Sequence, residues 1–137
     1  MITNWDLSRC DYKGGTSKRD YIKLKATIDG CNIVGKSIYV YYYYSTYDKR
    51  GNASYSDPRL LTNKTAPFDL EILYYGGYKT SWSNVFVLFS NKQMNVSTIT
   101  TDVPKKFWYM FGLPSETEGK NPARYVYEPR RPYSTSY

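Results

Sequence analysis

The stretch SIYVYYYYSTY, residues 37–47, decides the fold class. Apart from its two serines it consists of tyrosines and β-branched residues, which favour strands and form poor helices. Successive side chains of a strand point to opposite faces, so two sets of residues separate. One face carries Ile38, Val40, Tyr42 and Tyr44, and the other carries Tyr39, Tyr41 and Tyr43. The stretch therefore predicts a long strand with an aliphatic and aromatic face and a purely aromatic face.

Further segments on both sides of this stretch also predict strands. Residues 21–29 and 68–75 alternate apolar and polar side chains, a pattern typical of half-buried strands. Residues 84–90 contain an unbroken apolar run, which indicates a central strand covered on both faces. The threonine-rich residues 95–102 predict a strand, and residues 107–111 predict either a final strand or one turn of helix.

The whole chain is expected to be an all-β domain. Residues 48–67 are polar and rich in turn residues, so they predict a long connection that holds a short edge strand at residues 59–61. No segment predicts a helix of ordinary length. We therefore expect an antiparallel β-sandwich, immunoglobulin-like or jelly-roll, of about 6–8 strands. The length of 137 residues suits one such domain, which we place at residues 1–113.

Residues 114–137 are predicted to form an extended C-terminal arm. Four prolines break any regular element there, and only residues 124–127 could form a strand. Arginine and tyrosine are the residue types enriched at interaction hot spots. The candidate interface residues of the arm are Arg124, Tyr125, Val126, Tyr127, Arg130, Arg131 and Tyr133. Either the arm adds a strand to the sheet edge of a neighbouring molecule, or it is a disordered tail.

Tyr39, Tyr41 and Tyr43 are the candidate ligand-stacking face. They would project from one face of their strand at intervals of about 7 Å, which suits stacking on sugar rings, bases or a protein partner. Trp82, between two serines in an expected connection, is a further candidate platform. The alternative is structural: one set of tyrosines packs in the core and the other forms cross-strand pairs.

The chain contains no histidine, which excludes the usual Ser-His and Cys-His activation of a nucleophile and the commonest metal ligand. Asp69 and Glu71 form a nominal carboxylate pair, but a solvent-facing polar stripe on one strand explains them better. Neither a phosphate-binding loop nor the spacing of a calcium loop is present. We therefore expect a protein that is not an enzyme and has no metal ion and no cofactor.

The charge of the chain permits an acidic partner without requiring one. The net charge of +7 is dispersed, and the small basic patch of Arg19, Lys23 and Lys25 is typical of the outer side of an exposed strand. Nucleic acid is therefore not the expected partner. No stretch is apolar enough to span a bilayer, and no signal peptide is visible, so a membrane is not an expected partner either.

Cys10 and Cys31 match neither a redox motif nor a zinc motif. The alternatives are two buried thiols or a single bridge between them.

Taken together, these features predict a non-enzymatic structural or interaction protein. We expect a subunit of a larger homo- or hetero-oligomeric assembly, in a virus or bacteriophage particle, whose arm clasps a neighbouring protein subunit. The virion or the host cytoplasm would be its location. One alternative is a carbohydrate-binding module that holds a glycan on Tyr39, Tyr41 and Tyr43, with Trp82 as an extra platform. Another is a single-stranded nucleic-acid-binding barrel, whose binding should weaken steeply with salt.

Overall fold

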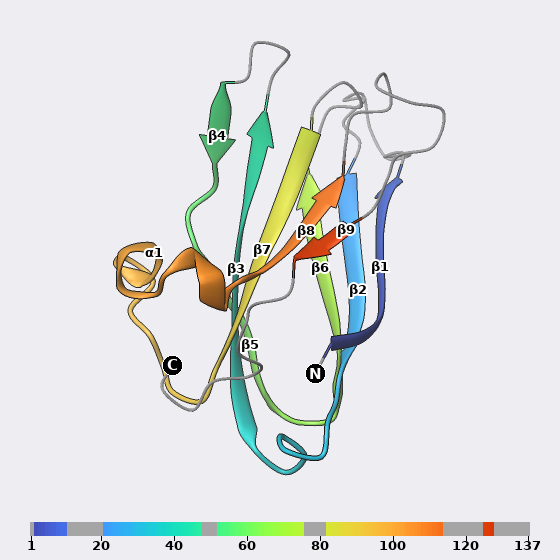
Figure 1. Cartoon of the computed structure of the whole chain (residues 1–137), viewed down its shortest axis with the longest axis vertical. Helices are drawn as coiled ribbons and strands as arrows, with labels where there is room; N and C mark the ends of the chain where they lie inside the picture. Colours follow the sequence, from blue (N-terminus) through green and yellow to red (C-terminus); the bar gives the residue numbers. More distant parts are fainter. Residues whose placement is uncertain (1, 11–20, 48–51, 76–81, 114–124, 128–137) are drawn as a thin grey trace.

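The computed structural model describes residues 2–10, 21–47, 52–75, 82–113 and 125–127, which form two antiparallel sheets (Figure 1). The small sheet has the order β1-β2-β6 and consists of β1 (Ile2–Cys10), β2 (Tyr21–Ile28) and β6 (Phe68–Tyr75). The large sheet has the order β4-β3-β7-β8-β9, and β5 also pairs with β3. Its strands are β3 (Ser37–Tyr47), β4 (Ala53–Tyr55), β5 (Arg59–Thr65), β7 (Trp82–Ser90), β8 (Tyr109–Leu113) and β9 (Tyr125–Tyr127).

The predicted antiparallel β-sandwich is confirmed, and its strand order is immunoglobulin-like. The first, second and sixth strands form one sheet, while the third, seventh and eighth are neighbours in the other. This is the separation of strands A, B and E from strands C, F and G in immunoglobulin domains. β4 and β5 pair with successive parts of β3, so they are two segments of the same sheet edge.

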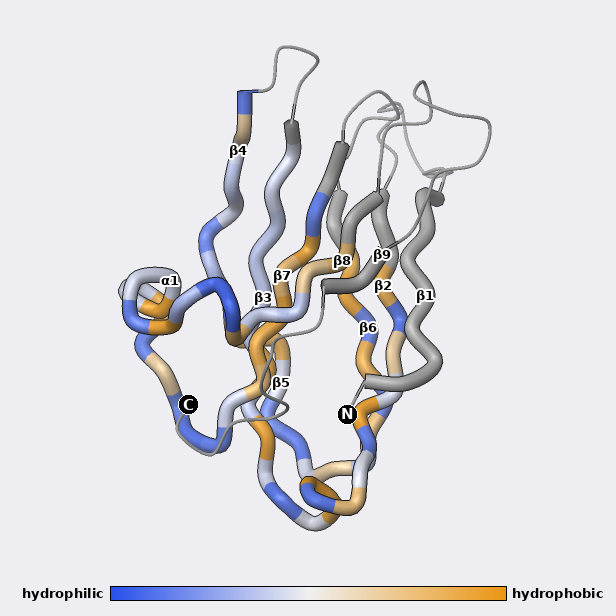
Figure 2. The backbone as a smooth tube through the Cα atoms, viewed as in Figure 1, coloured by the Kyte–Doolittle hydropathy of each residue, from blue (hydrophilic) through white to orange (hydrophobic). Residues whose placement is uncertain are grey.

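The central core lies between the two sheets and is built from the alternation seen in the sequence. Leu24, Ala26 and Ile28 of β2 are buried, whereas Lys25 between them is exposed. From the large sheet, β3 contributes its aliphatic face to the same core, and every residue from 84 to 90 is buried. The central strand predicted at residues 84–90 is thus confirmed. Figure 2 shows the hydrophobic residues of β7 as a continuous stretch.

A second, smaller core covers the outer face of the large sheet. The connection between β7 and β8, residues 91–108, folds into α1 (Ile99–Asp102) and the 3-10 turn η1 (Lys105–Phe107) (Figure 1). We call this segment the outer layer. Its buried residues Ile99, Val103 and Trp108 pack against Tyr41, Tyr43, Phe86 and Leu88 of the sheet.

The strand predicted at residues 95–102 is wrong, because side-chain hydrogen bonds and packing turn this segment into a short helix. The Asn95 side-chain Oδ1 accepts a hydrogen bond of 3.0 Å from the Ser97 N–H, which closes a turn just before α1. The Thr98 hydroxyl donates to the Asp102 carboxylate at 2.6 Å. Burial of Ile99 against the sheet then outweighs the strand preference of the threonines.

Residues 107–111 combine the two predicted alternatives, since η1 ends at Phe107 and β8 begins at Tyr109.

Trp82 lies in β7, so the prediction that it lies in a connection is wrong. Most of the described part of residues 48–67 is also paired, in β4 and β5. Pairing with the long β3 supplies these strands with partners that residue preferences do not reveal.

Trp108 joins the outer layer to the sheet. Its indole is 1% exposed and donates a hydrogen bond of 3.2 Å to the Val103 carbonyl. Its ring meets the ring of Tyr43 edge to face at 5.0 Å, and Tyr43 in turn stacks on Phe86 at 4.5 Å. Such aromatic pairs stabilise a contact beyond the area that they bury.

Trp108→Ala is expected to lower the free energy of unfolding by about 3–5 kcal/mol, since it removes the largest fully buried side chain. Urea denaturation followed by far-ultraviolet circular dichroism measures this change. Val96→Ala is the matched control, because Val96 is an exposed residue of the same layer and should change stability by less than about 0.5 kcal/mol. Equal effects of the two substitutions would contradict the existence of a second core.

Candidate functional site

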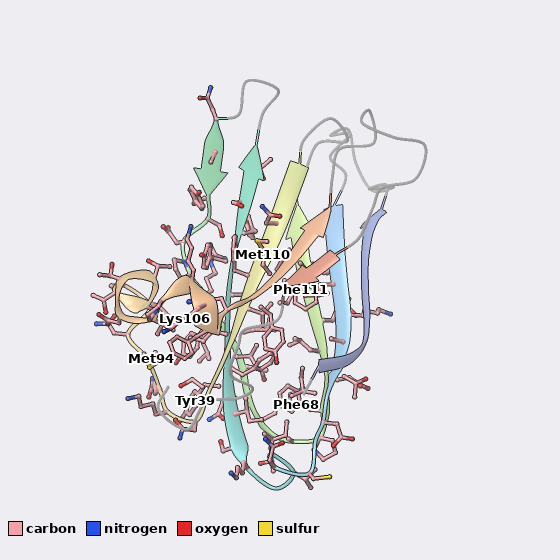
Figure 3. All side chains as sticks on the ribbon, in the orientation of Figure 1. Tyr39, Phe68, Met94, Lys106, Met110 and Phe111 are labelled. Carbon is pink, nitrogen blue, oxygen red and sulfur yellow. The ribbon has the colours of Figure 1, made fainter. Side chains whose placement is uncertain are left out.

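Tyr41 and Tyr43 do not form an exposed stacking surface, so this part of the predicted ligand face is wrong. Their side chains are 1% and 5% exposed because the outer layer covers them, and Tyr39 is half-buried at the rim. Figure 3 shows Tyr39 and Met94 near the same end of this face. The side chain of Trp82 lies outside the described part of the structure. Tyr42 and Tyr44, on the opposite face, pack against the central core.

The hydroxyl of Tyr41 holds the start of the outer layer. It accepts a hydrogen bond of 2.7 Å from the Met94 N–H and lies 3.4 Å from the Met94 carbonyl, to which it donates. The polar tip that a tyrosine normally presents to water or to a ligand is therefore used inside the molecule.

Tyr41→Phe is expected to reduce stability by about 1 kcal/mol, because the Met94 N–H loses its acceptor. The measurement is chemical denaturation, with Tyr39→Phe as the control from the same face. The hydroxyl of a half-buried Tyr39 can exchange its partners for water, so the control should be near neutral. A larger loss for Tyr39→Phe than for Tyr41→Phe would contradict this role.

The outer face of the small sheet carries a polar stripe over β2 and β6. Lys25, Thr27, Asp69 and Glu71 line an open depression of about 400 Å³. Thr27 donates a hydrogen bond of 3.1 Å to Asp69, and Lys25 stands directly opposite Glu71 in the strand register. This arrangement favours the solvent-facing stripe over a catalytic carboxylate pair. It also places Glu71 across from Lys25 of the small basic patch. The side chains of Arg19 and Lys23, the other two residues of that patch, lie outside the described residues.

Within the described residues, no group of three or more metal-ligating side chains occurs. The same part of the chain contains no helix long and apolar enough to cross a membrane.

The strand register separates the two cysteines. Cys10 lies opposite Tyr21 at the start of β2, whereas Cys31 lies in the turn that follows the other end of β2. Seven residue steps along β2 span about 23 Å, and a disulfide requires Cα atoms within about 7 Å. The fold therefore does not allow a bridge between them. Cys31 is exposed, which corrects the expectation of two buried thiols.

Both thiols are expected to be free within one chain. Denaturation without reductant, followed by iodoacetamide, should add two carbamidomethyl groups per chain, as counted by intact mass spectrometry. Prior reduction is the control and should leave the count unchanged. A chain that gains its two groups only after reduction would contradict the register of β1 and β2.

Three of the four sheet edges carry features that discourage pairing with another chain. The register of β1 is irregular between Thr3 and Asp6, and β6 exposes Asp69 and Glu71. The β4–β5 edge is interrupted by Pro58 and shifts its register at Leu61, and it also carries exposed charges.

β8, which lies between β7 and β9 in the large sheet, lacks these features. Its sequence YMFGL contains neither charge nor proline, and it pairs with β7 in unbroken register. Long, uncharged, apolar edges are templates for pairing with further strands. Here the next strand is β9, from the arm.

β9 is the described part of the predicted arm interface. It pairs antiparallel with β8, with Tyr125 opposite Gly112, Val126 opposite Phe111 and Tyr127 opposite Met110. The strand expected at residues 124–127 is thus present at Tyr125–Tyr127. Arg124, Arg130, Arg131 and Tyr133 lie outside the described residues. The boundary between residues 113 and 114 stays a prediction, and the β8 edge with its added strand is the candidate site.

We compared the chain with models of protein families, with curated proteins and with solved structures, and none of them matches. Function is therefore inferred from the geometry of the β8 edge and from the chemistry of the arm.

Proposed function

We propose that this chain is a non-enzymatic structural or interaction protein, a subunit of a larger assembly whose C-terminal arm binds a neighbouring subunit. The pairing of Tyr125–Tyr127 with β8 carries the proposal. Extended peptides bind proteins by adding a strand to an open sheet edge, where backbone hydrogen bonds supply affinity. A segment that adds to its own sheet in this way has the conformation that it needs to add to another.

The residues around β9 suit such a contact. Tyrosine and arginine are enriched among the residues that dominate interface energies, and Arg124, Arg130, Arg131 and Tyr133 surround the Tyr-Val-Tyr segment in sequence. The partners that we propose are protein subunits, either copies of this chain or different chains. A virus or bacteriophage particle is the proposed setting, because a compact sandwich with a basic, aromatic arm suits a repeated building block.

The polar side chains support a function without catalysis. Asp69 bonds to Thr27 and Glu71 faces Lys25, so neither carboxylate is arranged as an acid or a base toward the other. The alternative of a carbohydrate-binding module loses its support, because Tyr41 and Tyr43 are buried. For single-stranded nucleic acid, Lys106 lies 5.2 Å from the centroid of the Phe107 ring, and this contact alone does not supply the series of stacking platforms that such a ligand uses.

The average mass of the particles in solution is expected to rise above the chain mass of 16.0 kDa as the concentration of the full chain increases from about 10 µM to about 1 mM. At about 1 mM, a strand from another chain competes equally with the strand tethered to the same chain. Sedimentation equilibrium measures this mass. Val126→Pro, in the middle of β9, should abolish the increase, because proline is excluded from paired strand interiors. Ser136→Pro is the matched control outside the strand and should associate like the unchanged chain.

Val126→Pro also uncovers β8, and non-specific aggregation through that edge would obscure the result. A second variant therefore combines Val126→Pro with Met110→Lys, which gives β8 an edge charge of the protective kind. This double variant should remain monomeric and keep the circular dichroism spectrum of a β-sheet protein, because Met110 is only half-buried and a lysine there can extend its ammonium group to water. The proposal in its self-assembling form fails if the full chain stays monomeric throughout the range, or if the double variant associates as strongly as the full chain.

A further inference from the structure

We infer that the acceptor of the arm is the β8 edge of a second copy of this chain, and that the exchanged segment is Tyr125–Tyr127 in the register seen within one chain. This inference rests on the proposed function and deepens it, since it names the partner, the surface and the residue pairs. The result would be a sheet that continues from one subunit into the next.

The contrast between the sheet edges identifies β8 as the acceptor. β1, β6 and the β4–β5 edge each carry an irregular register, exposed charges or a proline, whereas β8 carries none of these. The β4–β5 edge does expose two large side chains, Tyr55 and Leu60, but its register shift and Pro58 interrupt the line of backbone groups that an added strand would need. The strand that lacks protective features, β8, is thus the one that pairs with the arm strand β9 in the structure.

The surroundings of β8 match an apolar segment on both faces of the sheet. Phe111, opposite Val126, is fully buried in the central core. Met110, opposite Tyr127, is half-buried and packs against the second core. Figure 3 labels both acceptor side chains along β8. In this register, two of the three residues opposite Tyr125–Tyr127 are hydrophobic, and the third is Gly112.

The length of the link between β8 and β9 permits exchange. Residues 114–124 separate the strands, and eleven residues can extend to at most about 40 Å. That length exceeds the separation of two adjacent strands, about 5 Å, by severalfold, so the number of residues allows β9 to reach a sheet other than its own. Exchange between copies keeps all three residue pairs of β8 and β9 and requires no new contact.

Mass action sets the condition for exchange. For a strand tethered by a short link, the effective concentration at its acceptor is on the order of 1 mM. A second copy competes equally only at a similar local concentration. The arm of a dilute chain therefore pairs with its own β8, and the arm of a crowded chain pairs with a neighbour, which would couple assembly to local concentration.

The experiment traps the register between two different chains. One full-length chain carries Met110→Cys and the other carries Tyr127→Cys, both in a background in which Cys10→Ser and Cys31→Ser remove the native thiols. The two are mixed at about 1 mM, the order of the competing effective concentration, and oxidised. Peptide mass spectrometry of the product of twice the chain mass should identify a disulfide between positions 110 and 127.

The matched control replaces Tyr127→Cys by Tyr125→Cys, which lies on the same strand but two residues out of register with Met110. It should give several-fold less of the two-chain product. A single chain that carries both Met110→Cys and Tyr127→Cys, oxidised at high dilution, should close the bond internally and stay monomeric, which checks that the variants fold and that the register is right.

Each outcome separates this inference from the proposed function. If the chains associate but the 110–127 disulfide between chains is absent, or is no more abundant than the out-of-register product, the exchange is overturned and assembly uses another surface. If the chains neither associate nor cross-link while the single chain with Met110→Cys and Tyr127→Cys closes internally, this inference and the self-assembling form of the proposed function both fail. Cross-linking at 110–127 between chains, rising with concentration, supports the exchange.

Discussion

β3 buries side chains on both of its faces, and the rest of the molecule is arranged around that fact. Ile38 and Val40 lie in the central core, while Tyr41 and Tyr43 lie in the second core. A strand with two hydrophobic faces requires a layer on each side. The small sheet provides one layer, and the segment between β7 and β8 provides the other.

The immunoglobulin-like order of strands explains how a short chain supplies both layers. β7 pairs with β3 along nine residues, so the connection that leaves β7 begins beside the tyrosines of β3. It needs only two short helical turns to cover them before returning to the sheet as β8. The covered tyrosines thereby lose the ligand-binding potential that an exposed aromatic face would have.

Periodicity was sufficient to predict the strands that face the central core, such as β2 and β6, because alternation reflects burial on one side. It could not show that the tyrosines of β3 are covered, since an exposed aromatic face and one packed under a later segment have the same pattern. The strand expected at residues 95–102 failed for a related reason: side chains of Asn95 and Thr98 form local hydrogen bonds that propensity does not weigh. β1 was not predicted at all, because its irregular register between Thr3 and Asp6 interrupts the alternation of apolar and polar residues that marks a strand. In the candidate site, the sequence indicated the strand of the arm. It did not indicate that β8 is the partner of this strand, because the neighbours of β8 depend on the order of strands in the sheet.

The large sheet contributes side chains to both hydrophobic cores, so the two cores are expected to unfold together on heating. Phe86 belongs to the second core and its neighbours Val85 and Val87 belong to the central one, so a displacement of β7 disturbs both. Residues that share a backbone segment couple energetically, and their effects do not add independently. The outer layer is therefore not an appendage that can melt early. It is part of one cooperative unit, and amide hydrogens in β3 and β7 should exchange with solvent mainly through global opening.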